Sequence, residues 1–166
     1  MRDLSKVGCV ALVLSLSLAA PVAAGPFEDG VAAAERRDYA TALRLFRPLA
    51  NQRSAAAQNR LGSMYDLGLG VTPDYAEALR WYRKAAEQGY ALAEDHLGFM
   101  YGQGLGVPQD YAVAATWYQK AADQGVVGAQ GSLGYMYENG QGVPQDYVQA
   151  HMWFNLAAAR LPGIAD

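Results

Sequence analysis

The sequence GVPQDY stands at residues 106–111 and returns unchanged at residues 142–147, and a near copy, GVTPDY, stands at residues 70–75. Each copy begins 36 residues after the one before it. Glycine permits left-handed backbone angles, proline stops a preceding helix from continuing, and aspartate is a favoured residue for beginning the next helix. The stretch therefore predicts a joint between two helices, present once in each repeat of the chain.

The repeat extends well beyond this joint. Residues 55–90 match residues 91–126 at about 21 of 36 positions, and a third copy covers residues 127–162. Upstream, residues 25–54 form a degenerate copy with a shorter joint, whose first helix near residues 27–36 lacks the Leu-Gly pair of the others. The residues that keep the period are Leu61, Leu97 and Leu133; Gly62, Gly98 and Gly134; Tyr65, Tyr101 and Tyr137; and Trp81, Trp117 and Trp153.

Each copy divides into two helical patterns. In the first, Leu61 and Tyr65 lie four residues apart on one stripe, and Gly62 leaves room for a neighbouring helix. In the second, Asp74 is the expected N-cap, Glu77 completes a capping box, and apolar residues recur with the spacing of an amphipathic helix. One hairpin cannot bury enough apolar surface by itself, so the pattern predicts an all-α solenoid of stacked helix-turn-helix repeats.

Residues 1–24 follow the plan of a secretory signal peptide. Arg2 and Lys6 precede an apolar run over residues 7–20, and small residues lead to an expected cut after Ala24. The run is shorter than the roughly 20 residues that cross a bilayer, so no stable membrane span is expected, and an uncleaved anchor is the weaker alternative. Cleavage would remove Cys9, and the protein is expected to be exported, periplasmic or secreted, without disulfides.

The repeat pattern resembles the Sel-one-like repeat family, which is related to the tetratricopeptide repeat. The resemblance rests on A-x3-LG-x2-Y-x2-G-x-GV-x2-DY-x2-A-x2-W(Y/F)-x2-AA-x-QG, which recurs over residues 55–160. It implies a right-handed α/α superhelix that serves as a non-catalytic scaffold or adaptor in the bacterial envelope and binds a peptide or partner protein in its groove. The alternative that the resemblance leaves open is a weak β-lactam-binding hydrolase of the related cysteine-rich branch, whose paired cysteines this chain lacks.

The third repeat departs from the family pattern. Leu161 stands where the pattern has glycine, and no closing helix follows it in the sequence. The apolar side of the last hairpin, including some of Met152, Phe154 and Leu156, is therefore expected to lack a covering repeat. Either the chain is a truncated member of the family, or this end self-associates with another chain.

Candidate partner-binding residues lie on the first helices, at positions that are neither repeated nor core-facing. Phe99 and Tyr135 occupy equivalent positions on adjacent repeats and are expected to turn away from the core. They could anchor a partner, or pack on the flank of the next hairpin. Arg60 and His96 are a second equivalent pair, which could contact an acidic segment or be solvated. His151 replaces an apolar residue and is expected to be half-buried.

Signatures of chemistry are missing from the sequence. It has no G-x-S-x-G, S-x-x-K, H-E-x-x-H or P-loop lysine, so no enzyme activity and no cofactor are expected. No second histidine lies at helical spacing from His96 or His151, so no metal site is expected. With residues 1–24 removed, the net charge is about −4 and no basic stripe remains, which disfavours nucleic-acid binding.

Overall fold

A computed structural model describes residues 25–160 of the chain. The expected signal peptide at residues 1–24, its Cys9, and Leu161 lie outside the described residues. The described part contains eight α-helices and no strand. They are α1 (Pro26–Glu35), α2 (Tyr39–Asn51), α3 (Ala55–Leu67), α4 (Tyr75–Ala86), α5 (Ala91–Gln103), α6 (Tyr111–Asp123), α7 (Val127–Asn139) and α8 (Tyr147–Ala158).

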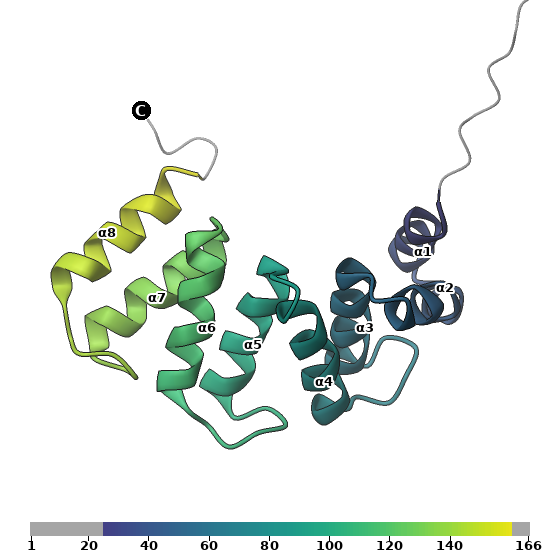
Figure 1. The fold of residues 1–166 in the computed structure, drawn as a ribbon, viewed down its shortest axis with the longest axis horizontal. Helices are drawn as coiled ribbons and strands as arrows, with labels where there is room; N and C mark the ends of the chain where they lie inside the picture. Colours follow the sequence, from purple (N-terminus) through teal and green to yellow (C-terminus); the bar gives the residue numbers. More distant parts are fainter. Residues whose placement is uncertain (1–24, 161–166) are drawn as a thin grey trace, which may run out of the picture.

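The helices form four consecutive hairpins, α1–α2, α3–α4, α5–α6 and α7–α8, and each helix packs on its neighbours in the sequence. Figure 1 shows the hairpins following one another along a crescent from α1 to α8. The predicted all-α solenoid of helix-turn-helix repeats is therefore confirmed.

The aspartates of the joints begin the second helices as predicted. The side chain of Asp74 accepts a hydrogen bond from the backbone N–H of Glu77 at 2.9 Å, and Asp38, Asp110 and Asp146 cap their helices in the same way. The expected capping box is wrong, because the N–H of Asp74 donates to the carbonyl of Tyr65 instead. The carboxylate of Glu77 accepts hydrogen bonds from the indole of Trp81 and the guanidinium of Arg80.

A glycine in each first helix lets the second helix of the same hairpin approach. A Cβ on Gly62 would lie 2.6 Å from the ring of Tyr82, and a Cβ on Gly98 would lie 2.7 Å from the ring of Tyr118. The degenerate repeat keeps this contact through Gly30, whose Cβ would lie 2.6 Å from the ring of Phe46. The sequence predicts that this repeat lacks the Leu-Gly pair. The leucine is indeed absent, but the glycine is present as Gly30, which the 36-residue period does not align with Gly62 because the joint is shorter.

The second glycine of each joint holds one repeat against the one before it. Gly106 has a left-handed φ of 69°, and a Cβ there would lie 2.8 Å from the backbone of Tyr75 at the start of α4. Gly142 stands in the same relation to Tyr111. The repeated joint is thus also a contact between repeats, which the sequence pattern alone did not reveal.

The core runs across the repeat boundaries. One cluster joins Leu79, Tyr82 and Ala86 of α4 to Leu97 and Met100 of α5, although these helices belong to different repeats. Corresponding clusters join α1 and α2 to α3, and α6 to α7 and α8. Each hairpin therefore completes its core with residues of the next one.

The exposed apolar face of α8 differs from the one expected. In α4 and α6, the position that the following repeat covers is occupied by Leu79 and Ala115, and both are buried. The equivalent position in α8 is occupied by His151, which is exposed and not half-buried as expected. Met152 and Leu156 share the register of exposed residues on α4 and α6, and Phe154 packs on Gly134 inside its own hairpin. Val148, Met152 and Leu156 are 78%, 41% and 42% exposed and form a stripe along the outer side of α8.

Candidate functional site

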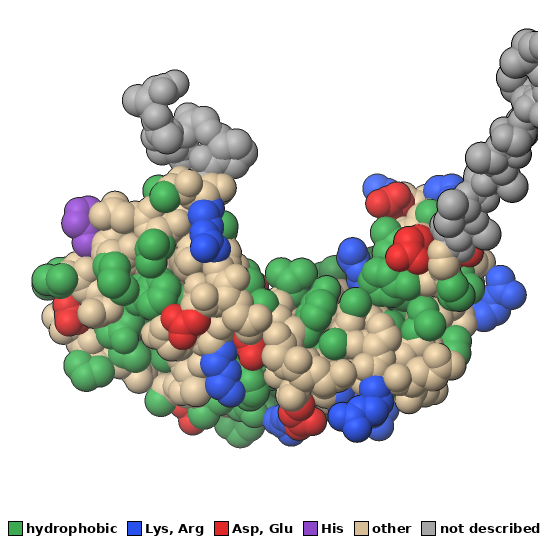
Figure 2. Space-filling model, turned by 45° about the horizontal axis from the view of Figure 1, so that its top comes forward, with side chains coloured by type: hydrophobic (Ala, Val, Ile, Leu, Met, Phe, Trp, Pro, Cys, Tyr) green, Lys and Arg blue, Asp and Glu red, His purple; other side chains and the backbone are tan. Residues whose placement is uncertain are grey.

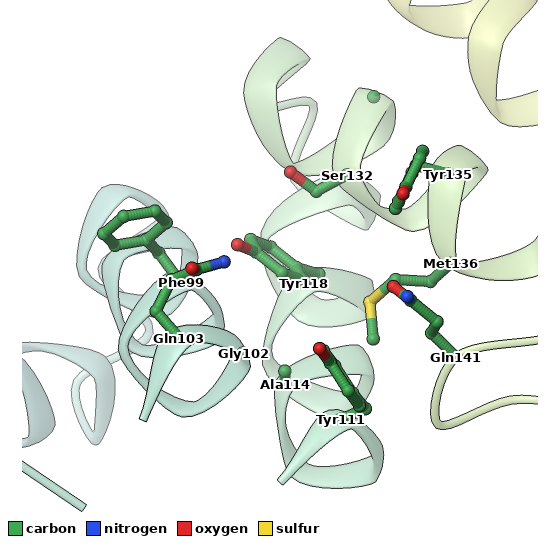
Figure 3. A pocket seen from close by; sticks show the side chains of 11 residues that line it. Phe99, Gly102, Gln103, Tyr111, Ala114, Tyr118, Ser132, Tyr135, Met136 and Gln141 are labelled. Atoms are coloured by element: carbon green, nitrogen blue, oxygen red, sulfur yellow. The ribbon is translucent and has the colours of Figure 1, made fainter. Parts of the chain in front are cut away.

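The candidate site is a cavity of about 420 Å³ between the first helices of two adjacent repeats. Phe99 on α5 and Tyr135 on α7 form opposite walls, and their side chains are 46% and 53% exposed. Figure 3 shows Tyr118 of α6 between these walls and Tyr111 at one end of the cavity. Two residues that the sequence placed in equivalent positions are thus brought to one cavity, and their binding role stays a prediction.

The cavity is open because small residues stand at three positions of its walls. Gly102, Gly131 and Ser132 occupy the positions that Asp66, Asp95 and His96 fill one repeat earlier. A Cβ on Gly131 would meet no heavy atom within 4 Å, and a Cβ on Gly102 would meet only Ala114 at 3.7 Å. Both are helical glycines, and each costs about 1 kcal/mol of helix stability relative to alanine. The chain therefore keeps this space open at a cost to its own stability.

The corresponding space one repeat earlier, between α3 and α5, is filled by side chains. The ring of His96 stacks on the ring of Tyr82 with centroids 4.5 Å apart. The hydroxyl of Tyr82 donates towards Ser63 Oγ at 3.1 Å and Asp66 Oδ2 at 3.4 Å. Burial lowers the pKa of His96, although the charge of Asp66 opposes this shift. The solvated state expected of His96 is wrong, because the ring is half-buried and favours the neutral form.

Arg60 does not share the environment of His96. Its side chain is exposed on α3, as the solvated alternative predicted, and it lies one repeat away from the cavity wall formed by α5. The two residues are equivalent in the sequence register, but only Arg60 remains a solvent-accessible cation.

The ionisable groups Tyr118 and Asp95 lie in or beside the cavity: Tyr118 in its lining, and Asp95 one turn before Phe99 on α5. Burial raises the pKa of Asp95, and burial raises the pKa of Tyr118 to about 12, so the phenol stays protonated at neutral pH. Among residues 25–160 the one ion pair is Arg80 with Glu77, and the carboxylate of Asp95 lies beside Gly128 of α7, where a Cβ would be 3.8 Å from Oδ2. The carboxylate of Asp95 is thus partly buried without an ion-pair partner among the described residues, and an approaching cation would stabilise its charged form.

The described residues do not assemble a nucleophile with its base. Ser63 donates to the carbonyl of Asn59 and accepts from Tyr82, while His96 lies face-on to the Tyr82 ring, so no Ser–His hydrogen bond forms within residues 25–160. Three or more His, Cys, Asp and Glu side chains placed to hold a metal ion do not occur in this part of the chain. None of its helices has the length and apolar character of a membrane-spanning segment.

Several cavity residues escaped the sequence prediction. Tyr111 and Tyr118 belong to the amphipathic apolar pattern of a second helix, and both line the cavity. The available signal was the change to Gly131 and Ser132 at positions that carry larger residues one repeat earlier. That change predicts a smaller side-chain volume at these positions. Only the packing of α5, α6 and α7 shows that the space left by the smaller side chains forms one connected cavity.

Known proteins share this repeat and this fold. The Sel1 repeat model matches residues 27–54, 55–90, 91–126 and 127–160. A crystal structure of a Sel1 repeat protein from Oxalobacter formigenes is 35% identical with a TM-score of 0.78, and the match covers 82% of this chain and 56% of that one. The structure of c5321, a protective antigen present in uropathogenic Escherichia coli strains and displaying an SLR fold, is 39% identical with a TM-score of 0.78. That match covers 81% of this chain and 30% of that one.

This chain therefore corresponds to about half of one solved relative and under a third of the other. A search of curated proteins found no match. Sel1 repeat proteins are generally protein-interaction scaffolds and are typically non-catalytic. With four matched repeats and the same fold, the chain belongs to the Sel1 repeat family.

Proposed function

We propose that this protein is a non-catalytic scaffold of the bacterial envelope, and that it holds a peptide or an extended segment of a partner protein over the cavity between α5 and α7. The observation that carries this proposal is the pair Phe99 and Tyr135, exposed on opposite walls of one cavity. A volume of about 420 Å³ lies within the range of ligand-binding pockets, and exposed aromatic residues are enriched in protein interfaces. Gln103 and Gln141 at its margin offer amide groups to a bound backbone.

The wider surface supports the same use. Figure 2 shows hydrophobic side chains gathered in the hollow between the two ends of the crescent. A stack of helices forms such a hollow before any partner binds, so binding does not require the ordering of a loop and its loss of conformational entropy. Repeat arrays use concave surfaces of this kind to bind partners.

A crosslinking pull-down from the envelope fraction tests the proposal. Wild-type protein is compared with the double variant Phe99→Ala, Tyr135→Ala, and Tyr147→Ala serves as the control, because Tyr147 is an exposed aromatic residue of α8 outside the cavity. We expect the double variant to lose a partner that wild type and control retain. Identical partners for all three proteins would contradict the proposed site.

Export and the lack of catalysis are tested separately. The expected signal peptide predicts that the protein purified from cells begins at Gly25, which mass spectrometry of the intact chain measures. The non-catalytic role predicts that a chromogenic β-lactam is not hydrolysed faster than by heat-inactivated protein. Turnover above that background would support the hydrolase alternative instead.

Self-association at α8 is a second proposal, carried by the exposed stripe of Val148, Met152 and Leu156. The same register holds Ala76, Arg80 and Lys84 on α4, so its apolar character is specific to α8. Sedimentation of wild type should show a concentration-dependent dimer that Met152→Lys reduces to a monomer. A wild-type monomer at all concentrations would rule the proposal out.

A further inference from the structure

Charge is divided between the two kinds of helix in this solenoid. Summed over the described repeats, the first helices α1, α3, α5 and α7 carry a net negative charge and the second helices a net positive one, although α3, α6 and α8 are each neutral. The two helices that form the cavity walls, α5 and α7, carry acids and no Lys or Arg. Within residues 25–160, the charged residues of the first helices are Glu28, Asp29, Glu35, Asp66, Glu94, Asp95 and Glu138, against the single base Arg60. Those of the second helices are Arg44, Arg47, Arg80, Arg83, Lys84 and Lys120, against Glu77 and Asp123.

Two of these acids flank the aromatic pair of the cavity. Asp95 precedes Phe99 by four residues on α5, and Glu138 follows Tyr135 by three residues on α7. At about 1.5 Å of rise per residue, the backbone of Asp95 lies about 6 Å before that of Phe99 along α5, and the backbone of Glu138 lies about 4.5 Å beyond that of Tyr135 along α7. Neither carboxylate forms an ion pair with a described residue. Of the nearby bases, Arg160 donates to the carbonyl of Gly125 and Lys120 lies over the ring of Trp117.

We propose that the segment bound in this cavity is cationic: one large apolar side chain enters between Phe99 and Tyr135, and Lys or Arg residues close to it in sequence meet Asp95 and Glu138. This inference rests on the proposed binding function and names the chemistry of the partner. An extended chain advances about 3.3 Å per residue, so basic residues one to three positions on either side of the apolar anchor reach the two acids. His96 is half-buried and stacked on Tyr82, so it does not offer a free cation to an acidic segment. Arg60 is exposed outside this cavity, and its contact with an acidic segment stays a prediction.

Selection from a random peptide library displayed on phage tests this inference with the purified protein. The counter-selection uses Gly131→Leu, which directs a side chain into the cavity from a position where a Cβ meets no heavy atom within 4 Å. Gly131→Ala is the matched control, since it adds the same helix preference without filling the space. We expect peptides that bind wild type and the alanine control to be lost on the leucine variant, and to carry Lys or Arg beside an aromatic or large aliphatic residue.

Charge variants then measure the contribution of the acids to the selected peptides. The double variant Asp95→Asn, Glu138→Gln should weaken binding about tenfold at low salt, as expected for two partly exposed ion pairs. The control double variant Glu87→Gln, Asp123→Asn removes the same charge from exposed positions outside the cavity and should leave binding unchanged. The loss should shrink as NaCl is added, because salt screens exposed charges.

The outcomes separate this inference from the proposed function. Peptides that depend on the open cavity but carry no excess of basic residues, or an excess of acidic ones, would overturn the cationic inference and leave the binding site in place. If no peptide distinguishes wild type from Gly131→Leu, the binding site itself is wrong. Equal weakening by both charge variants would show that net charge, and not Asp95 and Glu138, attracts the peptide.

Discussion

A buried glutamate at a repeat boundary gives the sharpest test of how the repeats are held together. Residues 58, 94 and 130 share one register, and the first and third are glutamines. Gln58 donates through Nε2 to the carbonyl of Ala50 at 3.0 Å and accepts from Gln88 at 2.7 Å. Gln130 likewise donates to the carbonyl of Ala122 at 3.1 Å. Glu94 accepts from Gln124 at 2.6 Å but, as a carboxylate, has no hydrogen to donate.

We predict that Glu94→Gln stabilises the protein at neutral pH. The new amide keeps the bond from Gln124 and can donate to the carbonyl of Ala86, the counterpart of Ala50 and Ala122. One additional buried neutral hydrogen bond contributes about 0.5–1.5 kcal/mol, and the variant also avoids burying a carboxylate. For a domain of this size we expect a rise in Tm of about 2–6 °C.

The stabilisation should depend on pH in a defined direction. Burial raises the pKa of Glu94 above its ordinary value of 4.5, although the hydrogen bond from Gln124 opposes the shift. The folded protein therefore binds this proton more tightly than the unfolded chain does. The wild type gains stability from Glu94 as the pH falls through the raised pKa, and this gain is complete below pH 4.5. The advantage of the glutamine variant should accordingly shrink over the same window.

Thermal unfolding followed by circular dichroism, across this pH range, measures both effects. Glu87→Gln is the matched control, because Glu87 is exposed at the end of α4 and its substitution removes the same charge. A lower Tm for Glu94→Gln at neutral pH would refute the proposed second hydrogen bond. An advantage that persists unchanged below pH 4.5 would refute the assignment of the effect to the buried charge.

Three further predictions concern stability and are measured by denaturant unfolding. Gly98→Ala places a methyl group 2.7 Å from an aromatic ring and should cost about 1–2 kcal/mol net of helix preference, whereas Gly131→Ala has open space and should gain about 1 kcal/mol; equal signs would contradict this packing account. Asp110→Ala should cost about 1 kcal/mol through loss of its N-cap bond, and Asp110→Asn should cost much less, so similar losses would exclude the cap as the cause. Gly106→Ala should cost at least about 3 kcal/mol of stability, because the position combines a left-handed φ with contact to the backbone of the preceding repeat. Gly89→Ala should cost only about 1–2 kcal/mol, because Gly89 has the left-handed φ without such a contact. A loss at Gly106 no larger than that at Gly89 would argue against the contact between repeats.

The candidate site was predictable only in part. The positions of Phe99 and Tyr135 followed from helical periodicity, since a residue two places after a buried leucine turns away from the core. The partial burial of His96 could not be predicted in this way, because its stacking on Tyr82 depends on how closely α5 approaches α4. The cavity itself depends on three helices from two repeats, so no single repeat pattern contains it.

By itself the sequence determined the hairpin, because a 36-residue period, joint glycines and capping aspartates act within a few residues of one another along the chain. These local preferences fixed where each helix begins and that the hairpins must stack. Only the tertiary structure decided which side chains remain accessible: it buried Glu94, placed the carboxylate of Asp95 beside Gly128 of α7, and left the space beside Gly131 open. The physical reason is that accessibility is set by residues of neighbouring repeats, whose approach depends on side-chain volumes far apart in the sequence.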